Sequence, residues 1–214
     1  EPNVVFCSSV GSACARADLW KRTVATMTDL PHRGLEADVV SCSTAITACE
    51  RGARWRQAST LLAKACEGGL RPDVIICNAA ISACEKGGQW RQANSHLAEL
   101  RSRDFQPRVI SCNAIVSACE KGGQWTLALR LFSEMQRRRW EPDRISCSAA
   151  ISSCEKNARW RRALELLAEM GRWDLKPGAT SFNAATSACG RGERWIWALG
   201  LLAKVRRGVQ KPNV

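Results

Sequence analysis

The feature that most constrains this chain is a 35-residue repeat that runs along it without an insertion. Six tryptophans keep this step: Trp20, Trp55, Trp90, Trp125, Trp160 and Trp195. Six cysteines keep it in another register: Cys14, Cys49, Cys84, Cys119, Cys154 and Cys189. Counted from Val4, six units cover residues 4–38, 39–73, 74–108, 109–143, 144–178 and 179–213, here called repeats one to six. Such a period is typical of solenoid proteins, in which one supersecondary unit recurs.

Two helices are predicted within each repeat, as repeat four illustrates. Cys112, Val116 and Cys119 recur at the spacing of one helix face, and a Gly-Gly pair then ends that helix. A second apolar stripe begins near Trp125, and Pro142 ends the repeat. A single hairpin has too little core to fold alone, so the repeats must stack on one another. We therefore expect an all-α solenoid superhelix of six helix-turn-helix repeats.

The ends of the sequence resemble each other, because Glu1-Pro2-Asn3-Val4 is echoed by Lys211-Pro212-Asn213-Val214. This echo predicts that the chain is a window of a longer array. No run of 18 apolar residues is present, so no membrane partner is expected. The 32 Lys and Arg against 20 Asp and Glu give a net charge of +12, which favours a polyanionic partner.

The 12 cysteines indicate neither disulfides nor a metal site. Cys112 and Cys119 lie two helical turns apart, about 10 Å along the axis, which is beyond the reach of a disulfide. No Cys-x-x-Cys pair occurs, and His32 and His96 are the only histidines. We expect small buried thiols, a reducing compartment and no cofactor, with Cys66 more exposed because it lies outside the periodic series. No catalytic grouping or nucleotide-binding loop is found, so an enzyme and a small-molecule substrate are not expected.

The periodic tryptophans admit two interpretations. They could be platforms on which nucleobases stack, or core residues at the start of the second helix. Their identical placement, in register with the apolar stripe, favours the core. His96 occupies a position that is Leu in four other repeats, which predicts a tolerated substitution.

A series of basic residues also keeps the 35-residue step: Arg16, Arg51, Lys86, Lys121, Lys156 and Arg191. Stacking would place these side chains along one surface, where they could follow a phosphate backbone. The alternative is a solvated face without a partner. The acidic residues beside the series, among them Glu50 and Glu120, would weaken its field.

Repeat four, which begins Val109-Ile-Ser-Cys-Asn and ends Glu-Pro-Asp143, resembles the pentatricopeptide repeat. The resemblance covers nearly the whole chain and rests on the 35-residue length and the terminal Pro-Asp. Tetratricopeptide repeats have 34 residues and a Trp-x-x-Leu-Gly start, which is missing here. Two departures occur: Cys or Phe182 stands at the fourth position, where an aromatic residue is usual, and Trp replaces the usual Leu that opens the second helix. The resemblance implies a right-handed superhelix that binds single-stranded RNA and acts in organellar RNA processing, stability or translation, in a mitochondrion or chloroplast.

In that family each repeat reads one RNA base, chiefly through its fifth and last residues. The resemblance assigns base reading to Ser8 with Asp38, Ser43 with Asp73, Asn78 with Arg108, Asn113 with Asp143, Ser148 with Gly178, and Asn183 with Asn213. It assigns base clamping to the second residues Val5, Val40, Ile75, Ile110, Ile145 and Thr180. With the N-terminus toward the RNA 5′ end, the implied target is G-G-Y-U-R-Y. The alternative for the Ser and Asn series is simple helix-start polarity. The alternative function is a protein-interaction scaffold like that of tetratricopeptide proteins.

Overall fold

The computed structural model describes residues 20–29, 38–103, 105, 107, 109–138, 140 and 142–209. These residues form α-helices joined by short connections, with no strand among them. The chain divides into two compact units, residues 1–118 and 119–214. The predicted all-α architecture of helical hairpins is confirmed.

The helices follow the register of the repeats. The first compact unit holds α2 (Trp20–Asp29), α3 (Val39–Arg51), α4 (Trp55–Glu67), α5 (Val74–Lys86), α6 (Trp90–Ser102) and most of α7 (Val109–Lys121). The second holds the end of α7, α8 (Trp125–Arg137), α9 (Arg144–Lys156), α10 (Trp160–Arg172), α11 (Ala179–Arg191) and α12 (Trp195–Val209). The odd-numbered helices begin on the first residue of a repeat, and the even-numbered ones begin on a periodic tryptophan.

Local chemistry fixes both ends of the first helix in each hairpin. Asp38 and Asp73 cap α3 and α5, because their Oδ1 atoms accept hydrogen bonds from the backbone N–H groups of Ser41 and Ile76, at 2.7 and 2.9 Å. At the other end the middle residue of each three-residue loop has a left-handed backbone, as at Ala53 with φ 53°. The same loop position has a positive φ in the later hairpins: Gly88, Gly123, Ala158 and Glu193.

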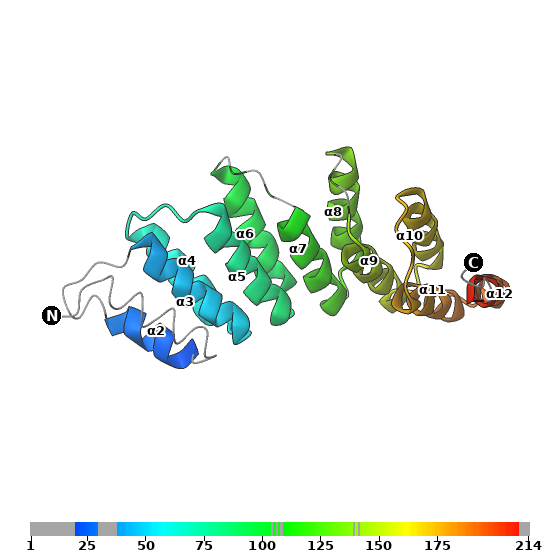
Figure 1. Ribbon diagram of the computed structural model, residues 1–214, viewed down its shortest axis with the longest axis horizontal. Helices are drawn as coiled ribbons and strands as arrows, with labels where there is room; N and C mark the ends of the chain where they lie inside the picture. Colours follow the sequence, from blue (N-terminus) through cyan, green and yellow to red (C-terminus); the bar gives the residue numbers. More distant parts are fainter. Residues whose placement is uncertain are drawn as a thin grey trace. The chain divides into compact units, whose positions relative to one another are not determined.

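The core lies between the stacked helices, and both the first and the second helices contribute to it. In the first compact unit α3 packs against α4 and α5, and in the second α9 packs against α10 and α11 (Figure 1). Ile46 and Ile81 are fully buried, as is Ile151 in the second unit. Full burial of such a side chain contributes about 1.5–3 kcal/mol, so stacking supplies the core that a single hairpin lacks.

The periodic cysteines belong to this core. Burial raises the pKa of Cys49 and Cys84 to about 11 and that of Cys119 to about 12. The ten cysteines in the described part of the chain are free thiols, and Cys66 alone among these ten is only partly buried. The thiolate is the reactive form, so the buried thiols should be inert.

We therefore expect Cys66 to be alkylated before the other cysteines of the described residues when the native protein is treated with iodoacetamide. The other nine cysteines of the described residues should react only after denaturation, because they are buried. Mass spectrometry after timed labelling would measure this order. Early labelling of Cys49 or Cys119 in folded protein would contradict it.

The prediction that the periodic tryptophans lie in the core is wrong. Trp55, Trp90, Trp125 and Trp160 are half-buried, and Trp195 is 66% exposed. Each stands at the first residue of a second helix, and the rings of Trp20, Trp55 and Trp160 reach the loop of the next hairpin.

The contacts of the tryptophans explain this placement. A Cβ at Gly52 would lie 2.7 Å from Cδ1 of Trp20, so only glycine lets the ring approach the next loop so closely. The guanidinium of Arg54 then lies over the same ring, 4.5 Å from its centre. Arg159 covers Trp125 in the same way in the second compact unit. The tryptophans therefore join consecutive hairpins at their loops.

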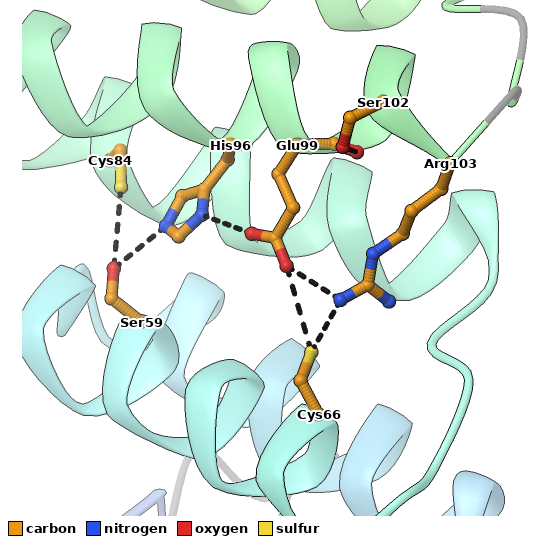
Figure 2. Close-up of polar contacts among 7 residues, drawn as sticks. All are labelled: Ser59, Cys66, Cys84, His96, Glu99, Ser102 and Arg103. Atoms are coloured by element: carbon orange, nitrogen blue, oxygen red, sulfur yellow. Dashed lines mark hydrogen bonds and ion pairs between the residues drawn. The ribbon is translucent and has the colours of Figure 1, made fainter.

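His96 is predicted from the sequence to be a tolerated substitution for Leu. The structure shows instead that His96 makes specific polar contacts. It is buried between α4 and α6, and its Nε2 lies 2.9 Å from Oγ of Ser59 (Figure 2). Burial lowers the pKa of His96, and the neighbouring Glu99 acts against this shift. Arg103 donates a hydrogen bond to Glu99 at 2.7 Å and contacts the Cys66 sulfur (Figure 2). These side chains hold α6 against α4 by polar contacts.

Candidate nucleic-acid interface

Branched aliphatic side chains are exposed at the second position of the first helices. In the first compact unit Val40 is 60% exposed, Ile75 68% and Ile110 64%, and we call these three residues the aliphatic row. In the second unit Ile145 is 70% exposed, and Thr180 is exposed as well. Hydrophobic residues exposed at the same place in repeats two to five are not required by the core, which favours a binding surface.

Polar side chains lie beside these aliphatic residues. The fifth residues Ser43, Asn78, Asn113 and Ser148 are half-buried, and Asn183 is exposed. Residues two and five of a repeat are three apart on one helix, so they share a face. The first helices α3, α5, α7 and α9 thus each present a hydrophobic side chain next to a hydrogen-bonding one.

Two of the fifth residues form side-chain hydrogen bonds with the third residue of the next repeat. Oγ of Ser111 donates a hydrogen bond of 2.6 Å to Oδ1 of Asn78. In the second compact unit, Oγ of Ser148 lies 2.7 Å from Oγ of Ser181. Ser111 and Ser181 are both third residues of their repeats and are buried, so the same pair of positions meets in both units.

The last residues of the repeats have a structural role that was not predicted. Asp38, Asp73 and Asp143 are N-caps of the helices that follow, and each uses Oδ1 to accept a backbone N–H. Gly178 takes the same position before α11 without a side-chain bond. The signal was present in the sequence, since Pro-Asp before an apolar run is a helix-start pattern.

Some of the predicted residues lie outside the described part of the chain. For base reading these are Ser8, Arg108 and Asn213, for clamping Val5, and for the basic series Arg16.

The basic series forms ion pairs between repeats. Lys86 contacts Glu50 at 3.3 Å, and Lys156 contacts Glu120 at 3.9 Å. In each pair the cation meets a carboxylate of the preceding repeat. The Lys86 and Lys156 side chains remain about two-fifths exposed, at 39% and 42%. They can therefore approach an anion, although the acidic partners reduce the positive potential as the sequence suggested.

Within the described residues, none of the helices has the length and hydrophobicity to cross a bilayer. No cluster of three or more His, Cys, Asp or Glu side chains placed to hold a metal ion occurs in this part of the chain.

Comparison with known families gives consistent matches along the chain. The pentatricopeptide repeat domain model matches residues 26–87 and 60–124, the PPR repeat family model matches residues 107–156, and the PPR repeat model matches residues 145–175. Together the three models span residues 26–175. No curated protein matches the chain.

Solved structures show the same fold. The pentatricopeptide repeat protein PPR10 from maize is 26% identical, with a TM-score of 0.70 over 97% of this chain. The chain spans only 30% of the length of that protein. PPR10 in complex with an 18-nt psaJ RNA element has a TM-score of 0.63 at 23% identity, covering 99% of this chain and 29% of that one. The PPR domain of Arabidopsis thaliana protein-only RNase P 1, solved with tRNA, has a TM-score of 0.74 at 8% identity, covering 88% and 98%.

Proposed function

The chain belongs to the pentatricopeptide repeat family, and we propose that it binds single-stranded RNA sequence-selectively, one base per repeat. The observation that carries this proposal is the aliphatic row with a polar side chain beside each member. A nucleobase has a flat face that packs on hydrophobic side chains and an edge that forms hydrogen bonds. Few other ligands present both features at a regular spacing.

Within the first compact unit, the second residues of consecutive repeats would flank one base. Ile75 and Ile110 would clamp the base read by Asn78, and Val40 and Ile75 the base read by Ser43. Because α3 packs directly against α5, such residues recur along one surface of the stack. The similar PPR10 has been solved in complex with an RNA element, which supports RNA as the ligand.

The basic series would bind the phosphates. Lys86, Lys156 and Arg191 lie at the C-terminal ends of first helices, and the net charge of +12 favours a polyanion over a neutral peptide. The pairs with Glu50 and Glu120 cost little to break, because surface ion pairs contribute about 0–1 kcal/mol.

Competition binding separates RNA binding from a peptide-binding scaffold. The protein would be titrated into a labelled RNA that fits the pattern G-G-Y-U-R-Y. Unlabelled RNA of the same sequence, or of a scrambled sequence, would then be added as the competitor. We expect the matched RNA to displace the probe at a lower concentration than the scrambled one. A protein that binds neither RNA, while retaining its helical spectrum, would leave the scaffold as the better proposal.

Binding should weaken with salt, and it should weaken for all sequences alike when Lys121 and Lys156 are replaced by Ala. The slope of log K against log salt is about −0.7 per phosphate neutralised on a single strand, so two lost contacts should reduce it by about 1.4. Fluorescence anisotropy at several salt concentrations measures the slope. Lys64→Ala is the matched control, because Lys64 is an exposed cation on a second helix. Loss confined to one RNA sequence would contradict a role at the backbone.

The family further suggests an organellar site of action, in RNA processing, stability or translation. Localisation of a fluorescent fusion of the full-length protein tests this part of the proposal, and a purely cytosolic signal would refute it.

A further inference from the structure

The third residue of one repeat touches the base-reading residue of the repeat before it. Ser111 is 1% exposed, and its Oγ donates to Oδ1 of Asn78 over 2.6 Å. Ser181, which is fully buried, stands in the same relation to Ser148 at 2.7 Å. In these two pairs a buried hydroxyl on the first helix of the next repeat therefore contacts the fifth residue.

We propose that Ser111 is a positioning residue that makes repeat three select cytosine over uracil. This inference rests on the proposed RNA-binding function. It narrows the expectation for repeat three from either pyrimidine to cytosine, and it assigns the choice to a residue outside the second, fifth and last positions.

The argument depends on which atoms of the Asn78 amide are available to a base. An asparagine side chain has one acceptor oxygen and one NH₂ donor. Ser111 engages Oδ1, so Nδ2 with its two hydrogens is the group left to meet the base. Cytosine N3 is an acceptor on the Watson–Crick edge, and it can receive one of these hydrogens. Uracil carries a hydrogen at N3, which would face the Nδ2 donor.

Rotating the amide to suit uracil would have a cost. Oδ1 would then turn toward the base, and the hydroxyl of Ser111 would lose its acceptor inside the protein. Leaving a buried hydrogen-bonding group without a partner is unfavourable, because water cannot replace the lost contact. The buried serine thus favours the amide orientation that fits cytosine.

The chain itself supplies comparisons at the same position. In repeat three the third residue is Ile76, which is buried and has no hydroxyl to hold Ser43. In repeat five the third residue is Ser146, whose Oγ donates to the backbone carbonyl of Asp143 at 3.0 Å. Ser146→Ala therefore removes a hydroxyl of equal burial that does not bond to Asn78.

The test compares two RNAs, 5′-GGCUAC and 5′-GGUUAC, which differ only at the third base. Their dissociation constants would be measured by anisotropy for the wild type, Ser111→Ala, Ser111→Thr and Ser146→Ala. We expect the wild type to prefer the cytosine RNA by roughly three- to tenfold, the effect of about one hydrogen bond. Ser111→Ala should bring the two constants within about twofold. Ser111→Thr, which keeps the hydroxyl, and Ser146→Ala should retain the preference.

The outcomes separate this inference from the function on which it rests. A wild type that binds neither RNA refutes the proposed function. A wild type that binds both equally or prefers uracil, or a preference that survives in Ser111→Ala, overturns the role of Ser111 alone. Should Ser111→Ala fail to fold, Ser111→Ile serves instead, since the chain already carries isoleucine at this position of repeat three. A merely structural serine would change both constants by the same factor and leave their ratio intact.

Discussion

Replacing Asn113 with threonine is expected to shift the base preferred by repeat four from uracil toward guanine. The pair of Asn113 with Asp143 resembles the uracil-reading combination of the family, in which an amide offers both a donor and an acceptor to a pyrimidine edge. Threonine has a single hydroxyl and cannot offer both groups in that geometry. A mismatched base should cost about 1–3 kcal/mol, borrowing the range known for DNA sites.

The measurement is a binding series with all four bases at the fourth position of the RNA. Ser43→Asn is the reciprocal variant, because Ser43 with Asp73 leans to guanine and the substitution creates the combination found in repeat four. It should move the second base from guanine toward uracil and leave the fourth unchanged. If wild type and Asn113→Thr bind the four RNAs equally, repeat four does not read its base.

The placement of the helices could be predicted from sequence because periodicity constrains it many times over. The odd-numbered helices from α3 to α11 begin where the repeat begins, and the second helices begin at the tryptophans. The aspartate and glycine signals recur in most of the repeats, so one misleading residue does not move a boundary. The exposure of Val40, Ile75 and Ile110 follows from the same register, since the third, fourth and seventh residues of their helices are buried in the core and the second residue is not on that face.

The environment of the tryptophans could not be predicted in this way. A repeat shows that Trp20 and Trp55 share an environment, but it does not show which environment that is. Whether the ring of Trp20 lies in the core or against a loop depends on Gly52 and Arg54. These two residues lie in the following hairpin and contact Trp20 only when two hairpins stack. An apolar residue in register with a stripe can therefore cover a loop instead of filling a core.

Contacts between polar residues of adjacent repeats could not be predicted from the sequence for the same reason. Ser111 and Asn78 are 33 residues apart, and Ser59 and His96 are 37 apart. Neither separation equals the repeat length, so no pattern in the sequence links them. The residues within one repeat specify the hairpin, while the offset between stacked helices determines which side chains meet across repeats.

Replacing both Ile75 and Ile110 with serine should reduce RNA affinity strongly while leaving the fold intact. Both side chains are mostly exposed, so their loss removes little core, and surface changes of this kind usually alter stability by less than about 0.5 kcal/mol. Serine and isoleucine also have similar helix propensities. If the two side chains pack on the faces of a bound base, their loss should cost about 2 kcal/mol, roughly thirtyfold in Kd. Anisotropy and thermal unfolding measure the two effects on the same samples.

Ile196→Ser provides the matched control for these two substitutions. Ile196 is 66% exposed, close to the 68% of Ile75 and 64% of Ile110, but it lies on α12, a second helix, whereas the polar fifth residues lie on first helices. If any exposed hydrophobic side chain can bind RNA, both the Ile196→Ser variant and the Ile75 and Ile110 double variant should lose affinity. A surface that clamps bases at the second position of each repeat would lose affinity only in the Ile75 and Ile110 variant. Unchanged affinity in that variant, with an unchanged melting temperature, would remove the aliphatic row from the binding site.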